Sequence, residues 1–154
     1  MALLNPYNYN KPKNALKAKD SKKNNLHEIR KEPKTKKDIY LEQKILVAKP
    51  EQLTLMLYDG LVRFLKQGKL FLSNGEDSYD KVNNSLQRGQ AIIHELRATL
   101  DMDIVISQNL DLLYEYMSRR TMDANMDKDE EVLDEVIELS IELRDTWKQA
   151  MESL

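Results

Sequence analysis

The sequence predicts an all-α protein: an antiparallel up-and-down four-helix bundle preceded by a mobile basic N-terminal arm. After Pro50, apolar residues recur at three- and four-residue intervals between short polar connections, and no segment reads as a strand. Before that point lysine and asparagine dominate and apolar residues are few. Four consecutive helices joined by short turns pack antiparallel. We therefore expect an arm over residues 1–40 and a bundle over 41–154.

The N-terminal arm differs from the bundle in charge. The whole chain has a formal net charge of −2, but residues 11–38 contain eleven Lys and Arg against four Asp and Glu, so this stretch carries +7 and the remainder −9. Its few apolar groups do not offset the entropy lost on ordering, and we expect a flexible insertion over 11–38. A solvated linker and a binding segment for nucleic acid or anionic lipid both fit this composition.

The first bundle helix is expected over 50–72, because Pro50 suits a first turn and Ser73-Asn74-Gly75 suits an end. One face has the pattern of a core stripe and contains Leu53, Met56, Leu57, Gly60, Leu61, Phe64, Gly68 and Phe71. A second apolar row lies outside that face and contains Leu55, Tyr58, Val62, Leu65 and Leu72. A helix that is apolar around so much of its circumference is either central in its fold or half of a binding surface.

The remaining helices are expected over 77–100, 103–125 and 129–150. The second has a narrow seam of Tyr79, Val82, Leu86, Gly89, Ile93, Leu96 and Leu100. In the third, the expected inward residues are Ile106, Leu110, Leu113, Met117 and Ala124, and an extra apolar strip consists of Val105, Leu112 and Tyr116. The last begins in an acidic turn, which the helix dipole favours, and is expected to bury Leu133, Val136, Ser140, Leu143 and Trp147.

The extra apolar residues of the first and third helices exceed what a four-helix core needs. The arm or a second copy of the chain can cover them, so a homodimer of the free protein is one expectation. The other is a groove that takes a partner helix or an extended peptide.

No residue pattern typical of catalysis or metal binding occurs in the sequence. Cysteine is absent, His27 and His94 are the only histidines, and there is no Glu-x-x-His, His-Glu-x-x-His or glycine-rich phosphate loop. We therefore expect no enzyme activity, no metal and no cofactor. The chain also lacks a start typical of a secretory signal, and no apolar run approaches the roughly 18 residues of a membrane span, which favours a cytoplasmic protein.

Several motifs resemble the flagellin-specific export chaperones of bacterial flagellar secretion, the FliS family. Pro50-Glu51-Gln52-Leu53 runs into Leu55-Met56-Leu57-Tyr58-Asp59-Gly60 and Arg63-Phe64. Asn5-Pro6-Tyr7 is similar to the N-terminal signature of the family, and parts of 113–125 and 138–147 are similar to its third and last bundle helices.

This resemblance implies a non-enzymatic cytosolic chaperone. Such a protein binds the disordered C-terminal segment of flagellin, prevents premature polymerisation and delivers flagellin to the export gate of the flagellar secretion apparatus. Together with the helical wheels, it places the contacts on Leu55, Tyr58, Val62, Leu65, Val105, Leu112 and Tyr116.

In the family the N-terminal segment can cover the empty groove, which here assigns Tyr7 and Tyr40 to a lid. The chain departs from the family at two points. Lys49 stands where a helix-capping Ser or Thr is common, and about thirty extra residues separate the two lid tyrosines.

A helical adaptor or a nucleic-acid-associated protein that uses the basic arm is the alternative from another class. Nucleic acid is not the expected partner, because the −9 carried outside residues 11–38 would repel a phosphate backbone.

Overall fold

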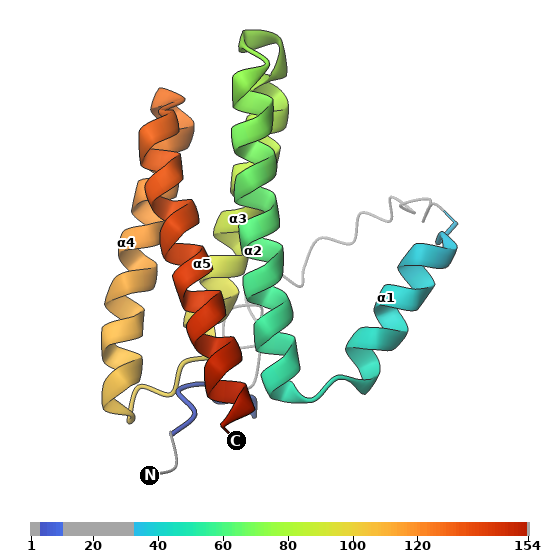
Figure 1. Ribbon diagram of the computed structural model, residues 1–154, viewed down its shortest axis with the longest axis vertical. Helices are drawn as coiled ribbons and strands as arrows, with labels where there is room; N and C mark the ends of the chain where they lie inside the picture. Colours follow the sequence, from blue (N-terminus) through green and yellow to red (C-terminus); the bar gives the residue numbers. More distant parts are fainter. Residues whose placement is uncertain (1–3, 11–32, 154) are drawn as a thin grey trace, which may run out of the picture.

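The computed structural model describes residues 4–10 and 33–153 of the chain. Its helices in chain order are α1 (Lys36–Val47), α2 (Pro50–Ser73), the 3₁₀ helix η1 (Glu76–Ser78), α3 (Tyr79–Ala98), α4 (Val105–Asp127) and α5 (Glu130–Glu152). Figure 1 shows α2 to α5 packed as an antiparallel bundle, from which α1 projects. The predicted all-α bundle is confirmed. Most of the insertion predicted to be flexible, residues 11–32, lies outside the described part of the chain.

The bundle is a ring of four helices, in which α2 packs on α3 and α5, and α4 packs on the same two helices. Two glycines allow α2 and α3 to approach closely. A Cβ at Gly68 would lie 2.7 Å from Cδ2 of Leu86, and a Cβ at Gly89 would lie 3.2 Å from Cδ2 of Leu65. Glycine has a low helix propensity, and at these two positions close packing between helices of the bundle offsets that cost.

The buried face of α2 differs from the one predicted. The residues that face the core follow alternating four- and three-residue steps through Thr54, Tyr58, Leu61, Leu65 and Gly68. Leu57 and Phe64, which were expected inside, are only half-buried. The ring of Phe64 lies at the outer edge, with the guanidinium groups of Arg63 and Arg88 at 5.1 and 5.6 Å from its centroid. The prediction was right for Gly60, Leu61 and Gly68, which are buried. It chose the rest of the face by hydropathy and therefore left out Thr54, Tyr58 and Leu65.

The core of α4 shows the same difference. Its inward positions are Ser107, Tyr114, Met117, Thr121 and Ala124, whereas Ile106 is 51% exposed. Hydroxyl groups are tolerated inside because they find acceptors on backbone carbonyls, as Thr121 does by donating to the Met117 carbonyl at 2.7 Å. The predicted core residues Leu110 and Leu113 pack against the core but are only partly buried.

The seams of α3 and α5 agree with the prediction. Burial extends through Val82, Leu86, Gly89, Ile93, Leu96 and Leu100 in and after α3, and through Leu133, Val136, Ser140 and Trp147 in α5. Tyr79 and Leu143 are half-buried. These two helices have one apolar face each, so hydropathy alone was sufficient to identify it.

Helix α1 was not predicted by the sequence patterns, and its first residues belong to the segment assigned to the arm. A capping box starts it: Thr35 Oγ1 accepts from the Asp38 N–H at 3.2 Å, and Asp38 Oδ2 accepts from the Thr35 N–H at 2.9 Å. It ends before Ala48 and Lys49, which are extended, as expected for residues that lead into Pro50. No residue of α1 is buried.

Candidate binding site at the base of the bundle

Residues 4–10, the N-terminal segment, lie across one end of the bundle, where α2 and α4 begin and α3 and α5 end (Figure 1). We call this end the base. The segment is held by main-chain bonds: the Asn8 N–H donates to the Thr99 carbonyl at 2.6 Å, and the Pro6 carbonyl accepts from the Asp101 N–H at 2.7 Å. The Ser107 hydroxyl donates to the same Pro6 carbonyl at 3.0 Å. An extended stretch of chain is therefore docked between the end of α3 and the start of α4.

Three tyrosine hydroxyls meet beneath this segment. Tyr7 Oη lies 2.5 Å from Oη of Tyr58 on α2, and the Tyr114 hydroxyl on α4 is hydrogen-bonded to both. The Tyr7 ring also meets Trp147 of α5 edge-to-face, with the ring centroids 5.3 Å apart. We call these four residues the tyrosine site. It joins the N-terminal segment to three helices of the bundle at one point.

The hydroxyls of the tyrosine site are neutral. Burial raises the pKa of Tyr7, Tyr58 and Tyr114 above the usual value of 10 for a tyrosine. Each hydroxyl can then donate one hydrogen bond and accept others, which suits a closed cluster of three. A partner that displaced Tyr7 would meet the hydroxyls of Tyr58 and Tyr114 and the ring of Trp147.

An exposed apolar row runs along α4, from this base to the other end of the helix. Val105, Leu112 and Met126 are 74%, 69% and 76% exposed. Tyr116 lies on the same line, since these four residues fall within about 80° of one another at about 100° per residue. We call them the α4 strip. The strip begins two residues before Ser107, the residue that binds the N-terminal segment.

Tyr116 is oriented by hydrogen bonds that link α4 to Glu135 of α5. Its hydroxyl donates to Glu135, which also accepts from Nη2 of Arg120 at 3.2 Å. The hydrogen bond from Tyr116, followed by that from Arg120, holds the pKa of Glu135 below its usual range. The network fixes the Tyr116 ring at the edge of the strip, where the Arg119 guanidinium lies 5.7 Å from the ring centroid.

Comparison with known proteins identifies the family. A profile described as "Flagellar protein FliS" matches residues 33–154. The chain is 37% identical over 114 residues to the flagellar secretion chaperone FliS of Bacillus subtilis (strain 168), covering 74% of this chain and 84% of that protein. The protein belongs to the FliS family. The chaperones of the same name from Salmonella typhimurium (strain LT2) and Escherichia coli (strain K12) are 33% and 32% identical, over 72% and 73% of this chain and 83% and 84% of theirs.

Membership in the FliS family confirms the resemblance seen in the sequence. FliS proteins are cytoplasmic secretion chaperones and not enzymes. Within residues 4–10 and 33–153, no three His, Asp or Glu side chains are placed to hold a metal ion. In the same part of the chain, no helix has the length and apolar character needed to cross a bilayer.

The α2 residues expected to line a FliS groove are mostly inaccessible. Val62 and Leu65 are 3% and 0% exposed, so the prediction that they form a surface strip was wrong. Both lie on the side of α2 that packs in the bundle, where Leu65 contacts the Gly89 position of α3. Tyr58 is 2% exposed and is bonded to Tyr7, and Leu55 is partly buried against the core. Accessible strip residues therefore come mainly from α4.

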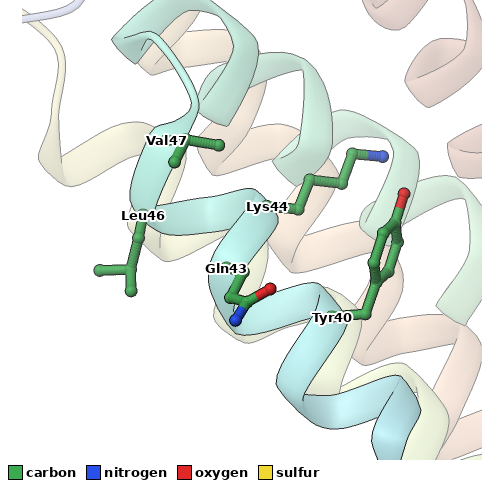
Figure 2. A pocket seen from close by; sticks show the side chains of 5 residues that line it. All are labelled: Tyr40, Gln43, Lys44, Leu46 and Val47. Atoms are coloured by element: carbon green, nitrogen blue, oxygen red, sulfur yellow. The ribbon is translucent and has the colours of Figure 1, made fainter.

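The two residues expected to act as a lid lie in different places. Tyr7 is in the tyrosine site, at 5% exposure, whereas Tyr40 lies on α1 and is 64% exposed. Figure 2 shows Tyr40 on this projecting helix with its neighbours. Tyr114 was not predicted to be a site residue, although it lies at a seam position three residues before Met117 and, as a buried tyrosine, needs a polar partner.

Proposed function

We propose that this FliS-family protein binds the C-terminal segment of flagellin, keeps it from polymerising too early and delivers it to the export gate of the flagellar secretion apparatus. The α4 strip, an exposed apolar surface next to a site filled by the chain's own N-terminal segment, is the observation that supports binding. Its relatives are named flagellar secretion chaperones, which supports delivery. The proposed contacts are Leu55, Tyr58, Val105, Leu112 and Tyr116.

Two modes of peptide binding fit these surfaces. The α4 strip presents Val105 and Leu112 seven residues apart and Met126 two heptads after Leu112, beyond Arg119, which suits an amphipathic helix along α4. The N-terminal segment shows that an extended chain can bond the backbone at Thr99 and Asp101. A disordered segment that binds in both ways becomes ordered on the bundle, and the entropy of that ordering limits the affinity. Limited affinity suits a chaperone that must release its cargo.

The N-terminal segment is then a competitor of flagellin for the base of the bundle. Release of residues 4–10 would uncover Tyr58 and Tyr114 and free the partners of Pro6 and Asn8. Until flagellin arrives, the segment keeps these groups hydrogen-bonded. A second copy of the chain remains an alternative cover for the α4 strip.

Titration calorimetry with a peptide of the cognate flagellin C-terminus tests this function. We expect one-to-one binding with a negative heat-capacity change, since apolar surface is buried. Leu112→Asp should weaken binding by about tenfold or more, which corresponds to roughly 1.4 kcal/mol. Leu70→Asp is the matched control, because Leu70 is 63% exposed on α2 and faces Arg144 of α5 instead of the strip. A folded protein that does not bind the peptide would exclude this function.

A further inference from the structure

Helix α1 is fully formed, but none of its residues is buried by the rest of the described chain. Six of its twelve residues are large and apolar, and each is at least 38% exposed; they are Ile39, Tyr40, Leu41, Ile45, Leu46 and Val47. A helix of this length is marginal on its own in water. A surface that buried its apolar side would therefore stabilise it as well as bind it.

Four of the six apolar residues of α1 share one side. At about 100° per residue, Ile39, Tyr40, Leu46 and Val47 fall within a sector of roughly 120°. Lys36 and Gln43 lie within the same sector, and Leu41 and Ile45 lie on the opposite side. Lys37 and Lys44 lie next to the Tyr40 edge of that sector. Figure 2 shows the Lys44 side chain beside Tyr40, with Leu46 and Val47 projecting from the end of the helix; all four line one shallow hollow with Gln43.

The charge around α1 is positive. Residues 33–49 contain five lysines and two acids, whereas residues 50–154 sum to −10. One of the two acids, Glu42, lies on the other edge of the apolar sector and is neutralised by Lys34, with Nζ and Oε1 2.7 Å apart. A basic, apolar helix is thus joined to an acidic bundle by two residues, Ala48 and Lys49.

No described protein surface of this chain matches α1 in both properties. The acidic helix α5 has no large apolar residue among those exposed. The α4 strip is apolar, but its line includes the oppositely charged Arg119 and Asp123, whose side chains are 58% and 45% exposed, so it offers no net negative charge. An anionic lipid bilayer has negatively charged headgroups at its surface and apolar acyl chains directly beneath them.

We propose that α1 binds the surface of anionic lipid bilayers. The helix lies flat in the headgroup region, with Tyr40, Leu46 and Val47 buried and with Lys37 and Lys44 directed to the phosphates. The same surface repels the acidic bundle, which is held away from it by the link at Ala48 and Lys49. This activity is independent of the proposed binding of flagellin, because the base of the bundle and the α4 strip take no part in it.

Co-sedimentation of the full chain with lipid vesicles tests the proposal. One set of vesicles is phosphatidylcholine alone, and the other contains about 30% phosphatidylglycerol; we expect at least about tenfold tighter binding to the second, weakened by salt. The double variant Leu46→Asp/Val47→Asp should lose at least about tenfold of this affinity. Two single variants provide the matched control for added charge. Leu70→Asp places one negative charge on α2 and should bind more tightly than Leu46→Asp, which places the same charge on α1.

Each other outcome overturns the proposal. Equal binding to neutral and anionic vesicles would exclude recognition of charge. Unchanged binding of the double variant would assign lipid binding to lysines elsewhere in the chain. A dimer in sedimentation equilibrium without lipid, returned to monomer by the double variant, would make α1 a contact between two copies. Circular dichroism checks that the bundle is folded in every variant. The double variant should bind the flagellin peptide with unchanged affinity, which separates a failure of lipid binding from a failure of the proposed function.

Discussion

The N-terminal segment and α1 both precede the bundle in the chain, but different kinds of contact order them. Residues 4–10 have no helix, yet Tyr7 is among the buried residues of the core and the backbone is bonded to Thr99 and Asp101. Helix α1 is regular and capped, yet none of its residues is buried. Regular secondary structure in α1 thus comes from local bonds, whereas the position of the N-terminal segment comes from contacts distant in sequence. The two should respond differently to perturbation.

High pH should separate the two regions most strongly. Tyr7, Tyr58 and Tyr114 have raised pKa values in the folded protein, and in the unfolded chain they ionise near 10. Above that pH the unfolded state loses protons that the folded state keeps, so stability is full below pH 10 and falls as the pH rises. A tyrosine that stays protonated in the folded protein lowers the stability by about 1.4 kcal/mol between pH 9 and 11, so the three together lower it by up to about 4 kcal/mol.

Urea denaturation at pH 9 and 11, followed by circular dichroism, measures this loss. Tyr7→Phe should reduce it by about one third, since one of the three ionising groups is removed. The same loss in the variant and the parent chain would show that the tyrosine site is open to water.

A core truncation in the bundle is expected to have the next largest effect. Leu65 is 0% exposed, and Leu65→Ala should lower the free energy of unfolding by about 3 kcal/mol, since it leaves a cavity between α2 and α3. The matched change on α1, Leu46→Ala, should stay within about 0.5 kcal/mol, because Leu46 is 83% exposed. Urea titrations of the two variants give the comparison, and similar losses would mean that α1 packs on the bundle in solution.

The sequence predicted the buried face of a helix well where the seam residues are apolar, and less well where they are polar. Helices α3 and α5 have one apolar face each, and their core was predicted almost completely. In α2 and α4, Thr54, Ser107 and Thr121 occupy seam positions, so hydropathy favoured a neighbouring face. Their three- and four-residue spacing with Tyr58, Leu61, Leu65, Tyr114 and Met117 is nevertheless present in the sequence, and serine and threonine suit these positions because they can bond the preceding turn.

The candidate site was predicted in part. Val105 and Leu112 are exposed on α4, as the extra apolar strip of that helix indicated. The meeting of Tyr7 with Tyr114 joins residues 107 positions apart, and no local pattern encodes such a contact. Helix α1 was missed although Thr35 and Asp38 have the spacing of a capping box, because the surrounding lysines dominated the composition.

The smallest expected effect concerns the start of α1. Thr35→Ala removes the acceptor for the Asp38 N–H, and loss of such a cap costs about 1 kcal/mol of helix stability. Since no α1 residue is buried, the loss should lower the helical population of residues 36–47 without changing the unfolding midpoint of the bundle. Amide exchange by NMR measures both regions in one sample. Thr35→Ser keeps the hydroxyl and should restore α1, whereas a shift of the bundle midpoint in Thr35→Ala would show that the helix and the bundle are coupled.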